Sequence, residues 1–178
     1  MKILPSLCLT RFLLFAVASP AAAWAGTPLF PNGDFRDGMG SWYLLCQEHA
    51  QAAAEVKGIE QGKHAVCVTV QTPGAEGYYV QLVQGNIPIA ASATYKLTFR
   101  ARSKPAGNIT LNLWPAHSSD PNALWRVDQV ALTDAWKEYS FEINPNDVSG
   151  NFNLDIGGLA RQAGEYWFTD ISLVEVEK

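Results

Sequence analysis

Apolar and polar residues alternate along most of the chain, which is the pattern of β-strands that bury one face and expose the other. In residues 95–102, apolar Tyr95, Leu97 and Phe99 alternate with basic residues and a threonine. Similar alternation predicts further strands over residues 41–46, 51–57, 64–71, 77–84, 107–115, 125–132, 136–143, 151–157 and 165–175. Because Gly, Pro, Asn and Asp separate these segments, we predict an all-β fold, a two-sheet antiparallel β-sandwich of the jelly-roll kind.

The first 25 residues have the organisation of a cleaved signal peptide. Lys2 and Arg11 precede an apolar run over residues 12–18, and Ala23-Trp24-Ala25 supplies a small-x-small cleavage site. The apolar run is shorter than the ~20 residues that a bilayer requires, so we expect no membrane anchor. We therefore predict a secreted or periplasmic protein in which residues 26–178 form one domain.

The charge of the remaining chain disfavours one class of partner. Removing Lys2 and Arg11 from the 13 basic residues leaves 11 against 17 acidic ones, a net charge of −6. Nucleic acid is a polyanion, so a chain of this sign is not expected to bind it. The three histidines lie in separate segments and have no metal-ligand spacing.

Two cysteines, Cys46 and Cys67, remain after removal of the signal peptide. Export to an oxidising compartment favours a disulfide between them, which would stabilise the fold by ~3 kcal/mol. Strand parity weakens this interpretation, because Cys46 is in phase with the apolar residues of its segment and Cys67 is out of phase with the neighbouring valines. A disulfide and two free thiols both remain open at this point.

The outward phase of several predicted strands is rich in aromatic rings and amides rather than in Lys, Glu and Thr. Flat aromatic rings stack on the C–H faces of sugars, and amides or carboxylates pair with vicinal hydroxyls. This phase therefore predicts a sugar-binding face, although the same rings could be core residues under a long loop. The candidate binding residues on it are Tyr43, Tyr79, Gln81, Asn112, Trp114, Asn151, Asn153 and Asp155.

Five sequence motifs, in their order along the chain, are similar to those of the cellulose- and xylan-binding modules of families four, nine and twenty-two. The motifs are Asn32-Gly33-Asp34-Phe35, Trp42, the strand 95–102, the strand 136–141 and Asp170-Ile171-Ser172-Leu173. The resemblance implies a galactose-binding-like jelly roll whose concave sheet forms a cleft for a polysaccharide or oligosaccharide of the β-glucan or xylan class. It also implies that residues 41–45, 79–83, 112–114 and 151–155 line this cleft.

The same resemblance assigns a role to the segment that follows Trp114. Similar modules have an aromatic sugar platform near the loop 116–124, so we expect Trp125 to stack on a sugar and Arg126 to donate hydrogen bonds to its hydroxyls. The alternative for Trp125 is the first residue of a strand, packed inward. His117, in the loop, is interpreted as a loop residue rather than as a ligand or base.

The resemblance further implies a structural calcium between Asp34, the 60–62 turn and Asp170. This chain has Arg36 close to that position, and a cation is unfavourable beside calcium, so bound calcium is not expected. We hypothesise instead that Arg36 pairs with Asp170 and bridges the two segments. No other cofactor is predicted.

No catalytic motif is recognisable in the sequence. G-x-S-x-G, H-E-x-x-H and phosphate-binding loops are absent, and Asp155 is the one acid expected to face the cleft. A glycoside hydrolase would need two suitably placed carboxylates. We therefore predict a binding module rather than an enzyme. The main alternative is a protein-interaction or adhesion module that uses the same aromatic face.

Overall fold

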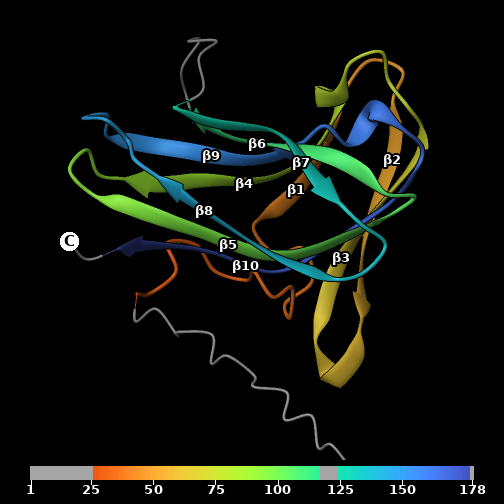
Figure 1. The fold of residues 1–178 in the computed structure, drawn as a ribbon, viewed down its shortest axis with the longest axis horizontal. Coiled ribbons are helices and arrows are strands. Elements are labelled where there is room, and N and C mark those ends of the chain that lie inside the picture. Colours follow the sequence, from red (N-terminus) through yellow and green to blue (C-terminus); the bar gives the residue numbers. More distant parts are fainter. Residues whose placement is uncertain (1–25, 117–123, 177–178) are drawn as a thin grey trace, which may run out of the picture.

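Two five-stranded antiparallel sheets form the fold over residues 26–116 and 124–176, the part of the chain that the computed structural model describes. The first sheet has the order β1 (Trp42–Cys46), β4 (Val80–Ile89), β9 (Gly150–Gly157), β6 (Gly107–Pro115) and β7 (Trp125–Leu132). The second has the order β2 (Gln51–Gly58), β3 (His64–Thr72), β10 (Gly164–Val176), β5 (Thr94–Lys104) and β8 (Lys137–Ile143). Figure 1 shows β9, β6 and β4 above β5 and β10. The predicted β-sandwich is confirmed. The expected signal peptide and His117 lie outside the described residues.

The core lies between the two sheets and is formed by the inward phase of the strands. Tyr95, Leu97 and Phe99 of β5 are each 1% exposed, as their alternation predicts. Leu82, Leu111 and Leu154 meet them from the first sheet and are fully buried. Because burying one such aliphatic side chain contributes about 1.5–3 kcal/mol, these two faces account for much of the stability of the sandwich.

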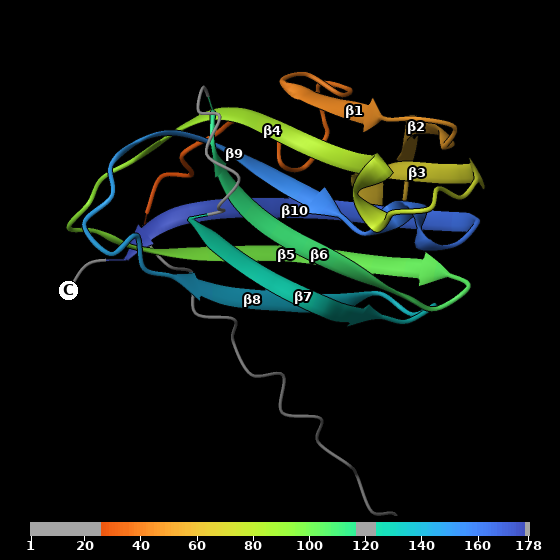
Figure 2. The same ribbon diagram turned by 90° about the horizontal axis from the view of Figure 1, so that it is seen from above.

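Among the described residues, three short 3₁₀ helices connect strands: η1 (Glu60–Gly62), η2 (Gly77–Tyr79) and η3 (Leu159–Arg161). η2 directly precedes β4 and η3 follows β9, and the two turns are in contact. Figure 2 shows β4, β9 and β6 side by side in the first sheet, so this pair of turns closes one end of its outer surface. In the described part of the chain, no helix is long and apolar enough to cross a membrane.

The N-terminal turn packs against an irregularity in the last strand. The backbone N–H of Ile171 donates to the Gly33 carbonyl over 2.9 Å, beside the register shift between Thr169 and Ser172 in β10. A Cβ at Gly33 would collide with the Ile171 carbonyl, so the close approach requires glycine. Two of the sequence motifs, the 32–35 turn and the 170–173 strand, are therefore in direct contact.

Basic side chains occupy the region in which the resemblance implied calcium. The Lys63 ammonium lies 2.9 Å from Asp170 Oδ2, and the Arg100 guanidinium lies 3.8 Å from Asp170 and 3.6 Å from Glu60. Arg36 pairs instead with Asp34, at 3.2 Å. The hypothesis of an Arg36–Asp170 pair is wrong, because Lys63 and Arg100 already neutralise Asp170. These residues do not fit a calcium ion, and within the described ranges no group of three or more His, Cys, Asp or Glu side chains could hold a metal.

The expected disulfide is not formed, and both Cys46 and Cys67 are free. Cys46 is exposed at the end of β1 in the first sheet, whereas Cys67 is buried on β3 in the second. Cys67 lies in a small cluster with Ala65 and Trp167 on the outer side of its sheet, away from the sandwich interior. A disulfide needs Cβ atoms that face each other about 4 Å apart, and two cysteines on different sheets in this arrangement do not meet that condition.

Candidate functional site

One row of side chains crosses the outer face of the first sheet, with one residue from each of its five strands. The strand register pairs these residues in turn as Tyr43, Val83, Asp155, Asn112 and Arg126. Directly opposite residues on one face of a sheet have their Cβ atoms about 4.5–5.5 Å apart, so neighbours in this row can act on the same ligand. Tyr43 and Arg126 thus lie at the two ends of this row, although they are 83 positions apart in the sequence.

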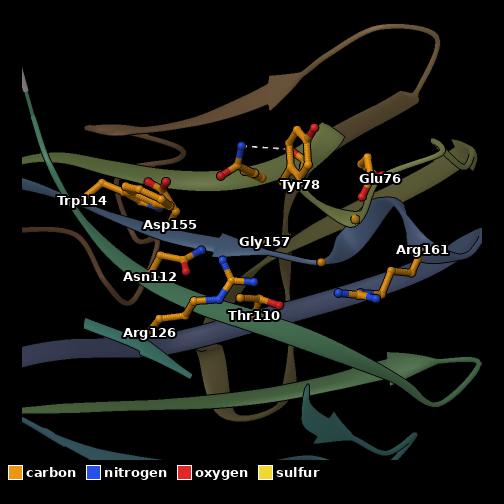
Figure 3. Close-up of a pocket in the computed structure, with 12 residues that line it drawn as sticks. Glu76, Tyr78, Thr110, Asn112, Trp114, Arg126, Asp155, Gly157 and Arg161 are labelled. Atoms are coloured by element: carbon orange, nitrogen blue, oxygen red, sulfur yellow. Dashed lines mark hydrogen bonds between the residues drawn. The ribbon is translucent and has the colours of Figure 1, made fainter. Parts of the chain in front are cut away.

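A groove of about 660 Å³ covers the Asp155, Asn112 and Arg126 part of this row and is bordered by the η2 and η3 turns. Figure 3 shows Asn112, Arg126 and Asp155 on adjacent strands, with Tyr78 above them. Trp114 also lines the groove. It pairs with Asn153 of β9, two positions before Asp155, and is therefore the diagonal neighbour of Asp155. The groove therefore combines aromatic surface with amide, carboxylate and guanidinium groups.

Gly157 and Gly158 keep the η3 end of the groove open. Gly157 is paired with Thr110, and its missing side chain leaves space beside Gln81. Gly158 has φ 79°, a left-handed conformation that favours glycine, and a Cβ there would lie 3.0 Å from the Thr110 backbone nitrogen. This turn leads directly into η3, which places Arg161 in the groove wall.

Asp155 and Asn112 lie opposite each other in the groove floor, where Asn112 is buried and Asp155 is half-buried. Burial raises the pKa of the Asp155 carboxyl to about 7, because the charged form loses solvation. Asn112 is 6% exposed, and its buried Oδ1 has no hydrogen-bond partner. Since buried polar atoms are normally paired, the orphaned Asn112 Oδ1, opposite the half-buried Asp155 carboxyl on the adjacent strand, indicates a site that a ligand completes.

Arg126 is held in place by a neighbour on its own strand. Its Nε and Nη2 donate to the two carboxylate oxygens of Asp128 over 2.9 and 2.7 Å, and Thr110 Oγ1 donates to the same carboxylate over 3.4 Å. The bond from Arg126 is the largest cause that lowers the pKa of Asp128. Both side chains of the ion pair are about half exposed, so its contribution to stability is small and its main effect is to orient the guanidinium.

Two exposed tyrosines flank the row. Tyr43 is 47% exposed at the β1 end, and Tyr78 is 53% exposed in η2. Burial and then the Asp155 carboxylate raise the pKa of Tyr43, which shows that these two groups are close. The Tyr78 carbonyl accepts a 2.8 Å hydrogen bond from Gln81 Nε2, which ties the η2 turn to the floor of the groove. Exposed aromatic rings on both sides of a polar floor are typical of a binding surface.

The structure brings together most of the residues predicted from strand parity, and also Arg126, which was expected from the family resemblance. Those that line the groove are Gln81, Asn112, Trp114, Arg126 and Asp155, and Tyr43 lies at the end of the same row. Asn153 is on the same face, where its Oδ1 accepts the Asn86 backbone N–H over 3.3 Å. Asn151 is exposed further along β9 and is not part of the groove lining.

Two predicted residues, Tyr79 and Trp125, lie outside the groove. Tyr79 packs against the core because the η2 turn ends the alternation before β4 begins at Val80, which gives Tyr78 the outward position. Trp125 pairs with Leu113, on the inward phase, and its ring contacts Phe141 of the second sheet with centroids 6.0 Å apart. Trp125 is therefore the first residue of a strand and packs inward, as the alternative interpretation stated.

Several groove residues were missed by the sequence interpretation. Tyr78 was lost because a 3₁₀ turn is hard to distinguish from the start of a strand, and Thr110 because a threonine within a strand carries no distinctive signal. Glu76 also lines the groove, so the expectation that Asp155 is its one acid is wrong. The consecutive Gly157-Gly158 pair was the one available signal that the chain turns sharply here and places Arg161 beside the groove.

Comparison of the sequence with known families gives one result. The profile of the family described as "Carbohydrate binding domain", which covers carbohydrate-binding-module families four and nine, matches residues 27–157. These residues include the N-terminal turn and all strands of the first sheet. No curated protein matches the sequence significantly.

Solved structures with the same fold include three small binding domains. A structure described as a family-four carbohydrate-binding module is 20% identical, with a TM-score of 0.67, and the match covers 82% of this chain and 98% of that one. The second N-terminal cellulose-binding domain of β-1,4-glucanase C from Cellulomonas fimi is 17% identical, with a TM-score of 0.62 and coverages of 86% and 97%. A xylan-binding domain of Xyn10C from Paenibacillus barcinonensis is 14% identical, with a TM-score of 0.60 and coverages of 88% and 99%.

Proposed function

Since the chain belongs to the carbohydrate-binding domain family, we propose that the groove of its first sheet binds a polysaccharide or oligosaccharide without transforming it. The ligand class is a β-glucan or a xylan. A cellulose-binding domain and a xylan-binding domain are among the structures with the same fold. The signal-peptide pattern of residues 1–25 supports a role outside the inner membrane.

The observation that supports this proposal best is the line of Asp155, Asn112 and Arg126 beside the Trp114 ring. A pyranose stacked on Trp114 presents its hydroxyls edge-on to the neighbouring strands. A carboxylate and an amide then accept or donate to those hydroxyls, and the guanidinium can engage two adjacent ones.

Affinity electrophoresis tests the proposal directly. The protein without residues 1–25 is run through native gels that contain soluble mixed-linkage β-glucan, xylan or no polysaccharide. We expect retardation by at least one polymer, and we expect Trp114→Ala to abolish it while the melting temperature changes little. Trp114→Phe keeps a flat ring and should restore part of the binding. Retardation that is equal for the parent protein and Trp114→Ala would contradict the proposed site.

Trp136 offers a matched control on the opposite side of the molecule. Its ring lies on the outer surface of the second sheet, with the guanidinium carbons of Arg100 and Arg102 5.4 and 5.2 Å from its centroid. Trp136→Ala removes a half-buried tryptophan as Trp114→Ala does, but should leave polysaccharide binding intact. If only Trp136→Ala lost binding, the ligand site would be on the second sheet.

Two other functions give different outcomes in the same experiment. A protein-interaction module would show no retardation in any polysaccharide gel, and Trp114→Ala would instead weaken capture of a protein partner. A glycoside hydrolase would release new reducing ends from xylan or β-glucan, and Asp155→Asn, which removes the buried acid of the floor, would stop this release. We expect no new reducing ends from either polymer.

A further inference from the structure

The hydrogen-bonding groups of the groove floor are unequally committed within the protein. Of its donors, Gln81 Nε2 is bound to the Tyr78 carbonyl, and Thr110 Oγ1 is bound to Asp128. Arg126 also directs two of its N–H groups to Asp128. A ligand that approaches this floor therefore finds Gln81, Thr110 and part of the Arg126 guanidinium already engaged. Arg161 and the other N–H groups of Arg126 also line the groove and can donate to a ligand.

Two hydrogen-bond acceptors of the floor, by contrast, have no donor in the described part of the protein. Asn112 Oδ1 is buried without a partner, and the Asp155 carboxylate has no hydrogen bond to any side chain or backbone group in the described residues. The two face each other across β6 and β9. Burial without a donor is also the cause that raises the pKa of Asp155 to about 7. A buried acceptor such as Asn112 Oδ1 is costly to leave unpaired, so this part of the floor favours a ligand group that donates a hydrogen bond.

From these two acceptors we propose that the floor at Asp155 and Asn112 selects sugar residues with free hydroxyls and rejects residues that are O-acetylated there. The inference rests on the proposed function and specifies the substrate class of the same site. A free hydroxyl brings the missing donor, whereas an acetyl ester has no O–H and turns a carbonyl oxygen toward a carboxylate.

Position in the groove strengthens the selection. Trp114 is the diagonal neighbour of Asp155, so a ring stacked on the indole has its edge close to the floor acceptors. The extra volume of an ester at that edge would have to displace the sugar from the indole or leave Asn112 Oδ1 unpaired. Sites that hydrogen-bond a substrate hydroxyl discriminate strongly against analogues that lack it, by contrast with purely apolar pockets.

The test uses one batch each of soluble xylan and soluble mixed-linkage β-glucan, divided into three parts. One part is untreated, one is lightly O-acetylated, and one is acetylated and then saponified. Affinities for the three are compared by affinity electrophoresis and calorimetry. We expect acetylation to weaken binding at least about tenfold. Saponification should restore the affinity, which excludes damage to the polymer backbone as the cause.

Two variants connect the effect to the floor. Asp155→Asn has nearly the same shape and introduces an N–H donor, so it should reduce the discrimination between untreated and acetylated polymer to about two- to threefold. Asn112→Ala removes the orphaned acceptor and should reduce it as well. Asp134→Asn, at an exposed position in the β7–β8 connection, should keep the full discrimination. Melting temperatures confirm that each variant is folded.

The outcomes separate this inference from the proposed function. If neither polymer is bound in any form, the proposed function fails and the inference fails with it. If untreated and acetylated polymers bind equally well, polysaccharide binding stands and the hydroxyl selection is overturned. The selection is likewise overturned if Asp155→Asn discriminates as strongly as the parent protein.

Discussion

Asp128 binds the guanidinium of Arg126 through both carboxylate oxygens, two residues along the same strand, and so fixes the one arginine of the five-residue row. Asp128→Asn keeps the shape of this side chain but removes its charge and one of the two acceptors. We expect polysaccharide affinity to fall about three- to tenfold, because Arg126 then samples orientations that do not face the groove. Calorimetric titration with xylan or β-glucan measures the change.

The control for this prediction is the stability of the same variant. The ion pair is half exposed, so its loss should lower the free energy of unfolding by at most about 1 kcal/mol. A variant that binds as tightly as the parent protein would show that Arg126 needs no partner to be oriented. A variant that is strongly destabilised would show a structural role instead.

Asp155 makes binding dependent on pH in a defined direction. The free protein holds this carboxyl with a pKa of about 7, because burial disfavours its charged form. Sugar hydroxyls donate more strongly to the carboxylate than to the acid, so the pKa in the complex is lower. Affinity should therefore increase as the pH rises from 6 to 8, by up to about tenfold, and level off above that range.

Other charged groups of the groove set the background for this pH dependence. Arg126 and Asp128 border it, and their mutual hydrogen bond raises the pKa of Arg126 and lowers the pKa of Asp128, so both stay charged between pH 6 and 8. Burial raises the pKa of Tyr43, which stays neutral over the same interval. Asp155→Asn should consequently flatten the affinity profile over this interval. A profile that keeps its slope in Asp155→Asn would assign the effect to another group.

The two thiols should differ in reactivity. Cys46 is exposed, while Cys67 is buried beneath Trp167 and burial raises its pKa, so the reactive thiolate is scarce. Under native conditions we expect a thiol reagent to modify one cysteine rapidly and the second only after unfolding, as measured by mass spectrometry. Reducing agent should leave the melting temperature unchanged. A fall in melting temperature on reduction would instead indicate a disulfide.

Removal of calcium should not weaken the fold. Lys63 and Arg100 neutralise Asp170 at the junction between the η1 turn and β10. We expect a chelator to shift the melting temperature by less than the error of the measurement, and Lys63→Ala to cost about 1 kcal/mol of stability. Calorimetry should detect no calcium binding at micromolar affinity. Tight binding that Asp170→Ala abolishes would contradict this assignment.

Strand parity predicted the fold and a large part of the groove, because alternation is a local property that the sheet register preserves. Asn112 and Asp155 face the same side since each is flanked by buried apolar residues on its own strand, and each strand could be interpreted alone. What parity could not provide was their adjacency. That depends on β6 pairing with β9, a contact between segments about 40 residues apart in the chain.

The predictions for Tyr79 and Trp125 were wrong for two reasons. The alternation of inward and outward side chains is interrupted at Tyr79, and the orientation of Trp125 was inferred from the family resemblance. The η2 turn exchanged the positions of Tyr78 and Tyr79, since a 3₁₀ turn rotates successive side chains by about 120° rather than 180°. Trp125 is the first residue of β7, and the residues before it in the sequence do not alternate, so they do not predict which way its side chain points. Its pairing with the inward-facing Leu113 places it on the inner face of the sheet. The cysteines could not be resolved from parity, because parity does not say which sheet a strand joins.

Tyr78 and Tyr79 provide a matched pair of variants with opposite expected effects. Tyr78 is exposed beside the groove, so Tyr78→Ala should weaken polysaccharide binding about tenfold and leave the melting temperature nearly unchanged. Tyr79 packs on the core and against Gly74, so Tyr79→Ala should instead lower the melting temperature. Affinity gels and thermal melts of both variants measure the two quantities side by side. If Tyr79→Ala lost binding at full stability while Tyr78→Ala bound normally, the assignment of the outward position to Tyr78 would be wrong.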